Sequence, residues 1–96
     1  MMIKKKRNRE PTSRVAKHIG NRLRQLREEK KLTIRDVAAL CEVSNPYVCQ
    51  VENGQSVPSA EMLWKLAQGL GVDVEYFFQG LRWKKKRAFR SKAKKG

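Results

Sequence analysis

The chain has 96 residues, a length that suits one small domain with appendages and is too short for two ordinary domains. Its 23 basic and 9 acidic residues leave a formal net charge of +14, which excludes an ordinary neutral surface and favours a polyanionic partner: nucleic acid, an anionic membrane or an acidic protein. Because 40% of the residues are hydrophobic, a globular core is expected rather than a wholly disordered basic protein.

The excess charge lies at the two ends of the chain. Residues 1–14 form a basic N-terminal arm, and residues 82–96 form a basic C-terminal tail without an acidic residue. The stretch 15–81 is formally neutral and is predicted to be the folded domain. The tail is expected to follow phosphates, and a disordered solubilising segment is the alternative interpretation.

The sequence shows no sign of membrane insertion or secretion. No apolar run approaches the length of a membrane span, and no charged stretch is followed by an apolar signal region. Two cysteines, Cys41 and Cys49, are too few for a disulfide scaffold. We therefore expect a cytoplasmic protein with reduced thiols and no membrane partner.

Five short helices around one core are predicted. Val15, Ile19, Leu23 and Leu26 recur every three or four residues, which is the stripe of an amphipathic helix. No segment alternates with period two for long enough to form a strand, so the predicted fold class is all-α. The helices are expected at about 16–30, 34–41 and 45–53, after Ser59, and in a short last segment containing Tyr76, Phe77 and Phe78.

Capping residues separate the second and third helices. Thr33 is a predicted N-cap, and Asp36 takes the acidic role of a capping box. Ser44 is the next N-cap, with Pro46 in the first turn of the third helix, where its missing N–H costs nothing. Asn53-Gly54 is expected to end that helix.

The second half of the domain has similar signals. Pro58-Ser59 opens the fourth helix with Ser59 as its cap, and Gly69 and Gly71 mark its end. Asp73 is the predicted cap of the last short helix.

Two short helices joined by a tight turn, 34–41 and 45–53, are the sequence form of a helix-turn-helix. Several further motifs follow one another in order: Ile19 to Arg24, Leu26 to Thr33, Val37-Ala38, Val43-Ser44, Val51-Glu52-Asn53-Gly54, Pro58-Ser59, Leu66-Ala67, Leu70-Gly71-Val72 and Tyr76-Phe77-Phe78. With these motifs the run from Ile19 to Phe78 resembles the lambda-repressor-like family, also called the Cro or XRE type. The resemblance implies a five-helix DNA-binding domain.

The resemblance also implies that the helix 45–53 lies in the major groove of DNA. Asn45, Pro46 and Gln50 match the family positions that contact bases. Asn and Gln can each pair with two edge atoms of adenine, whereas Pro46 can only touch a thymine methyl or shape the helix entry. For Asn45 and Gln50 the alternative is a polar residue on a solvated helix.

Other family positions imply phosphate contacts and a structural ion pair. The pair corresponds to Arg27 and Glu52, which would join the first helix to the recognition helix. For the phosphate positions, simple capping or turn chemistry is the alternative. The matching residues are Thr33, Arg35, Tyr47, Asn53, Gln55 and Ser56.

Three residues depart from the family pattern. Ile34 stands where the family often has a phosphate-binding Gln, so one anchor is absent. Glu42 stands where a Gly usually turns the chain, and a left-handed backbone there would cost about 1–2 kcal/mol. Cys49 flanks the base-contacting positions and is assigned no readout role, because its thiol is a weak donor.

These observations predict a sequence-specific DNA-binding transcriptional regulator that acts as a repressor. Its expected partner is double-stranded DNA, bound as a homodimer on two half-sites. Exposed aromatic residues near the last helix, and Trp64, are the candidate dimer interface.

Two other classes remain open. One is an antitoxin-like or accessory protein that binds a protein partner through the C-terminal tail and regulates its own promoter. The other is a non-specific nucleic-acid binder that uses the tails alone. An enzyme is not expected, nor is a cofactor or metal: His18, the single histidine, is read as solvated, and no paired carboxylates or metal-ligand spacing accompany it.

Overall fold

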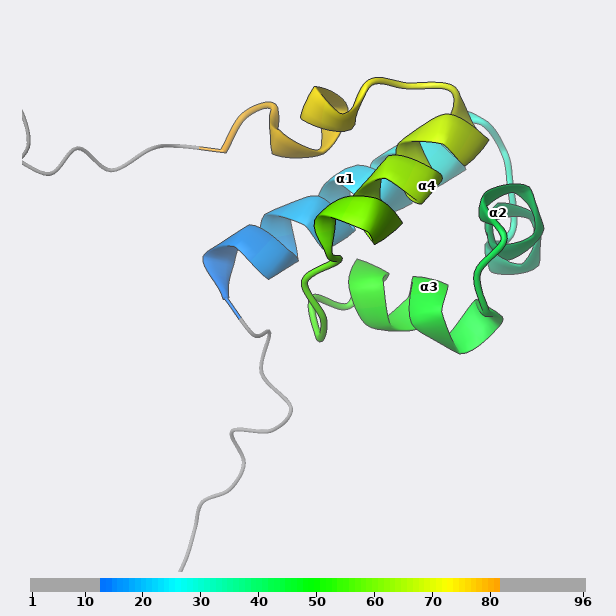
Figure 1. The fold of residues 1–96 in the computed structure, drawn as a ribbon, viewed down its shortest axis with the longest axis horizontal. Helices are drawn as coiled ribbons and strands as arrows, with labels where there is room; N and C mark the ends of the chain where they lie inside the picture. The colour runs from blue at the N-terminus through cyan, green and yellow to red at the C-terminus, as the bar shows by residue number, and fades with distance from the viewer. Residues whose placement is uncertain (1–12, 82–96) are drawn as a thin grey trace, which may run out of the picture.

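The computed structural model describes residues 13–81, and every regular element in this range is helical (Figure 1). The α-helices are α1 (Arg14–Glu29), α2 (Ile34–Cys41), α3 (Asn45–Glu52) and α4 (Ala60–Leu70), and a 3-10 helix, η2 (Val74–Phe78), follows them. The all-α prediction is thus confirmed for this part of the chain. No helix among these residues is long and apolar enough to cross a membrane. The expectations for residues 1–12 and 82–96 lie outside the described residues.

Five short helices were predicted, but only four α-helices form in the described residues, and the last predicted helix is the 3-10 helix η2. The helical segment itself, Val74–Phe78, has only five residues, and short helical pieces favour the tighter 3-10 pattern. Asp73 stands at the N-cap of η2, but its side chain makes no capping hydrogen bond, contrary to prediction.

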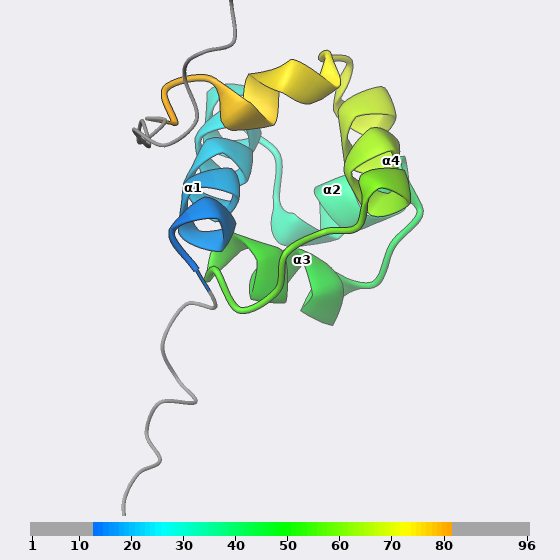
Figure 2. The same cartoon turned by 60° about the vertical axis from the view of Figure 1, so that its left-hand side comes forward.

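The helices form a ring around one core (Figures 1 and 2). α1 packs against α3 and η2, α2 packs against α3 and α4, and η2 contacts α4. Figure 2 shows η2 bridging α1 and α4 on the side of the molecule opposite α3. The neighbours of α3 within this ring are therefore α1 and α2.

Every element contributes a fully buried apolar side chain to this core. Each burial of this kind stabilises the fold by about 1.5–3 kcal/mol. A helix as short as α3 would not persist alone in water, so its structure depends on this packing. The residues are Leu23 of α1, Val37 of α2, Val48 of α3, Leu66 of α4 and Phe77 of η2, each 0% exposed.

The beginning of α1 lies earlier than predicted. Ser13 is its N-cap, and the Ser13 hydroxyl accepts a hydrogen bond from the Ala16 N–H at 3.0 Å. Arg14 is consequently the first residue of α1 and does not belong to the arm. The Ser59 cap of α4 is confirmed, because its hydroxyl accepts from the Met62 N–H at 3.1 Å.

Residues with a left-handed backbone end two helices. Glu42 closes α2 at φ 61°, and Gly71 closes α4 at φ 74°. Gly69, however, lies inside α4 and does not mark its end. A Cβ atom at Gly69 would lie 2.8 Å from the Leu40 carbonyl oxygen, so this glycine permits close contact between α4 and α2.

Two polar side chains of α1 hold the end of the described chain. His18 Nε2 lies 2.8 Å from the Gln79 carbonyl oxygen, so the half-buried His18, predicted to be only solvated, also contacts the end of the described chain. Arg22 Nε donates to the Tyr76 carbonyl at 2.8 Å, and its guanidinium carbon lies 3.8 Å from the centre of the Tyr76 ring. The chain therefore leaves η2 along the N-terminal half of α1.

The aromatic residues divide between core and surface. Phe77 is fully buried and Tyr76 half-buried, so neither is a free surface group. Trp64 of α4 is 55% exposed and Phe78 39% exposed. Of the aromatic residues considered for a dimer interface, these two remain available.

Candidate nucleic-acid interface

The outer face of α3 carries the three residues predicted to contact bases. Asn45, Pro46 and Gln50 are all exposed, and Cys49 is exposed between them. Positions one turn apart lie on the same side of a helix, so these residues form one continuous surface. The opposite side carries Val48 and Val51, both 0% exposed, and faces the core.

The start of α3 is fixed by local hydrogen bonding. Ser44 Oγ accepts from the Tyr47 N–H at 3.1 Å, and Pro46 lies in the first turn, as predicted. Tyr47 packs partly against the core, and burial raises the pKa of its phenol. The entry of the helix is thus anchored beside the exposed Asn45.

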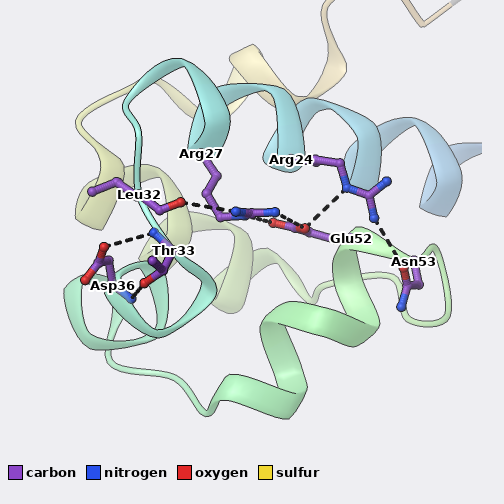
Figure 3. Close-up of polar contacts among 7 residues, drawn as sticks. All are labelled: Arg24, Arg27, Leu32, Thr33, Asp36, Glu52 and Asn53. Atoms are coloured by element: carbon purple, nitrogen blue, oxygen red, sulfur yellow. Dashed lines mark hydrogen bonds and ion pairs between the residues drawn. The ribbon is translucent and has the colours of Figure 1, made fainter.

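The N-terminus of α2 forms the predicted capping box (Figure 3). Thr33 Oγ1 accepts from the Asp36 N–H at 3.0 Å, and Asp36 Oδ2 accepts from the Thr33 N–H at 2.9 Å. Hydrogen bonds from the backbone N–H and the side chain of Thr33 to the Asp36 carboxylate lower its pKa. The Thr33 N–H is therefore occupied by a carboxylate, and the exposed Arg35 is a group at this end of α2 that could meet an anion.

An ion pair joins α1 to the end of α3. Arg27 Nε lies 2.7 Å from Glu52 Oε2, and Arg27 Nη2 lies 3.1 Å from Glu52 Oε1. Arg27 Nη1 also donates to the Leu32 carbonyl at 3.1 Å. The Glu52 side chain is only 2% exposed, and its hydrogen bond raises the pKa of Arg27. This is the bidentate geometry that a buried carboxylate requires.

A second arginine, Arg24, also belongs to this site, although the sequence did not predict it. Arg24 Nε lies 3.4 Å from Glu52 Oε1, and Arg24 Nη2 lies 3.3 Å from Asn53 Oδ1. The signal was present, because Arg24 stands one helical turn before Arg27 and so shares its side of α1. Figure 3 shows the two arginines reaching Glu52 from the same helix.

The phosphate candidates lie on both sides of this cluster. Figure 3 shows Thr33 and Asn53 at opposite ends of the row formed by Arg27, Glu52 and Arg24. Asn53 is the C-cap of α3 and is exposed. Gln55 is exposed and Ser56 half-buried in the loop that follows. The structure thus places candidate groups before and after α3, around its exposed face.

Gly20 is a further residue whose role the sequence did not disclose. A Cβ atom there would lie 2.7 Å from the Glu52 carbonyl oxygen and would also clash with the Val51 carbonyl. The absence of a side chain lets α1 lie directly on the last turn of α3. This contact and the ion pair hold the exposed face of α3 in a fixed orientation.

Within residues 13–81 no group of three or more His, Cys, Asp or Glu side chains could hold a metal ion. Both cysteines are free thiols, with Cys41 buried and Cys49 exposed. Burial raises the pKa of the Cys41 thiol to about 11.

Three comparisons relate this chain to known proteins. It is 37% identical over 62 residues to the HTH-type transcriptional regulator DdrOP3 of Deinococcus deserti, and 40% identical over 57 residues to the HTH-type transcriptional repressor RghR of Bacillus subtilis. These matches cover 65% and 58% of this chain, and 48% and 42% of the two relatives. The chain therefore spans about half the length of the curated relatives it matches.

A solved structure agrees in fold. The restriction-modification controller protein C.AhdI of Aeromonas hydrophila superposes with a TM-score of 0.64 and 35% identity, over 66% of this chain and 96% of that one. The family model described as helix-turn-helix matches residues 23–77, from α1 to η2. The chain therefore belongs to the helix-turn-helix family of the Cro/XRE type.

Proposed function

We propose that the chain is a sequence-specific DNA-binding transcriptional regulator that inserts α3 into the major groove. The observation that carries this proposal is the two-sided character of α3, which buries Val48 and Val51 while it exposes Asn45 and Gln50. A helix is about 10–12 Å wide, which fits a major groove of about 12 Å. Asn45 and Gln50 supply the hydrogen bonds to base edges, and Pro46 supplies an apolar contact.

Groups on both sides of α3 would fix its position on the DNA backbone. Thr33 and Arg35 lie at the N-terminus of α2, and Tyr47 lies at the start of α3. Contacts from these groups to phosphates orient the protein without reading sequence. After α3 the same role falls to Asn53, Gln55 and Ser56.

Repression by occupying a promoter is the regulatory mode we propose. The name of the Bacillus subtilis relative, a transcriptional repressor, supports it. The chain covers less than half of that relative, so the regulatory effect is carried over as part of the proposal.

The active form is proposed to be a homodimer on two half-sites. Trp64 and Phe78, both exposed, are the apolar groups that support it. Sedimentation equilibrium of the chain and of Trp64→Gln tests this point, since the substitution should lower the mass of the assembly. An unchanged mass would exclude Trp64 from a dimer interface.

The basic segments before Ser13 and after Leu81 are proposed to add attraction to the DNA backbone beyond that of the helical domain. Each neutralised phosphate steepens the salt dependence of binding by about 0.9 in the log–log slope. Truncation to residues 13–81 should weaken binding to every duplex and flatten this slope, while the preferred sequence stays the same. A changed preference would mean that these segments read bases.

Selection of duplexes from a random pool tests the function as a whole. A recovered palindrome would report sequence preference and dimerisation together. On the recovered duplex, Gln50→Ala should lower affinity about 10- to 100-fold and leave binding to random DNA unchanged, because a bidentate contact discriminates by about 1–3 kcal/mol. Gln68→Ala is a matched change at an exposed position of α4, and it should alter neither the affinity for the recovered duplex nor the binding to random DNA. Equal losses on both duplexes would overturn the assignment of Gln50 to base readout.

A further inference from the structure

The cluster around Glu52 contains one positive charge more than its carboxylate can neutralise. Two guanidinium groups, from Arg24 and Arg27, share this single buried carboxylate. The Arg27 side chain is 17% exposed and makes the short contacts, whereas Arg24 is 43% exposed and lies 3.4 Å from Glu52. The remaining charge is thus carried to the surface by Arg24.

Arg24 also determines which end of the Asn53 amide faces outward. A guanidinium can only donate hydrogen bonds, so the amide presents its oxygen to Arg24 Nη2, at 3.3 Å. The amide nitrogen then points away from Arg24, as Figure 3 shows. Without this contact the terminal torsion of Asn53 has two broad minima that exchange oxygen and nitrogen.

At the position of Asn53 a nearby cation favours anion binding. Asn53 is the C-cap of α3, and the C-terminal end of a helix carries a partial negative charge of about −0.5. This charge repels a phosphate. The guanidinium of Arg24 offsets it at the point where the Asn53 amide offers its two donors.

We propose that Arg24 is a positioning residue that makes Asn53 a donor to a backbone phosphate of DNA. Glu52 anchors the guanidinium, the guanidinium holds the Asn53 oxygen, and the Asn53 NH₂ group meets the phosphate. The inference rests on the proposed function. It assigns to Arg24 a role separate from that of Arg27, which ties α1 to α3.

A double-mutant cycle on the duplex recovered from the random pool tests this role. Arg24→Gln in the full chain should weaken binding roughly tenfold, since a hydrogen bond to a charged group is lost together with a cation. Lys17→Gln is the matched control, because it removes the same charge from an exposed position of α1. In the Asn53→Ala background, Arg24→Gln should weaken binding only as much as Lys17→Gln does. An equal effect of Arg24→Gln with and without the Asn53 side chain would overturn the proposal.

Asn53→Asp provides a second variant that leaves Arg24 in place. Its carboxylate would pair with Arg24 and offer no donor, so it should bind the duplex more weakly than Asn53→Ala. Binding equal to or stronger than that of Asn53→Ala would contradict the donor role of the amide.

NMR of the free chain separates this inference from the proposed function. The side-chain amide signals of Asn53 should differ from those of Asn21, which is exposed on α1, and Arg24→Gln should shift them toward the Asn21 values. Unchanged Asn53 signals in that variant would overturn the positioning role whatever the DNA result. If the unsubstituted chain bound no duplex, the proposed function would fail, and the NMR result would still decide the orientation of Asn53.

Discussion

Gly20 of α1 lies directly against the main-chain carbonyl of Glu52 at the end of α3, so that a Cβ atom at Gly20 would stand 2.7 Å from that oxygen. Main-chain atoms cannot rotate aside as a side chain can. Gly20→Ala should therefore push α1 away from α3 and lower the free energy of unfolding by about 2–3 kcal/mol. Urea denaturation measures this loss.

Gly71→Ala is the control for this prediction. Gly71 has φ +74° but no atom within 4 Å of a Cβ, so only the left-handed backbone is penalised, by about 1–2 kcal/mol. A smaller loss for Gly20→Ala than for Gly71→Ala would contradict the close packing of α1 on α3.

The Arg27–Glu52 pair is expected to act mainly on the stability of the fold. Its loss should lower the free energy of unfolding more than it changes any DNA contact. Arg27→Met should cost about 3–5 kcal/mol, because the Glu52 carboxylate is then left buried without its bidentate partner. Arg35→Met, a change of the same type on exposed α2, should alter the unfolding free energy by less than about 0.5 kcal/mol. Thermal unfolding by circular dichroism compares the two variants, and similar losses in both would argue against the buried pair.

The capping box of α2 should make stability depend on pH in the acid range. Hydrogen bonds from Thr33 lower the pKa of Asp36 below its ordinary value of 3.8. The Asp36 carboxylate therefore contributes stability that is complete above this value and is lost as the pH falls through the lowered pKa. Asp36→Asn removes that titration, so the stability difference between the chain and this variant should shrink at the acid end. A stability difference between the chain and Asp36→Asn that stays constant from pH 6 to pH 2 would contradict the lowered pKa of Asp36.

The two thiols should differ sharply in reactivity. Cys49 is exposed on α3, whereas Cys41 is buried and its pKa is raised to about 11, so little Cys41 thiolate forms near neutral pH. A disulfide reagent at pH 8 should modify one thiol in the native chain and both in urea. Cys49→Ser should abolish the native reaction, and two rapidly reacting thiols in the native chain would contradict the burial of Cys41.

Modification of Cys49 should also block duplex binding, because the adduct would project from the face that carries Asn45 and Gln50. Retention of full affinity by the modified chain would argue that this face does not enter the groove.

Local patterns predicted much of the fold. The bounds of α2 and the capping box of Thr33 and Asp36 agree with the structure. Each depends on residues within about four positions of one another, where hydrogen-bond geometry follows from the side chains themselves. The start of α1 was missed, although Ser13 is a good N-cap type, because the apolar stripe gave no signal before Val15.

The last element shows where local patterns fail. The run from Val74 to Phe78 reads as a short helix, but the structure forms it as a 3-10 helix with Phe77 buried in the core. The contacts of the polar residues of α1 are likewise not predicted by local patterns. His18 looks solvated in sequence and contacts Gln79, 61 positions later, because η2 crosses α1 at that point.

The sequence by itself determined the all-α class and the residues on the outer face of α3, since periodicity and capping act within single helices, and its ordered motifs carried the resemblance to the helix-turn-helix family. The tertiary structure alone decided that Gly20 receives the end of α3 and that Arg24 joins Glu52 to Asn53. These contacts link residues about 30 positions apart, and they depend on how closely and at what angle two helices cross. That geometry is set by the packing of the whole core, which no single segment specifies.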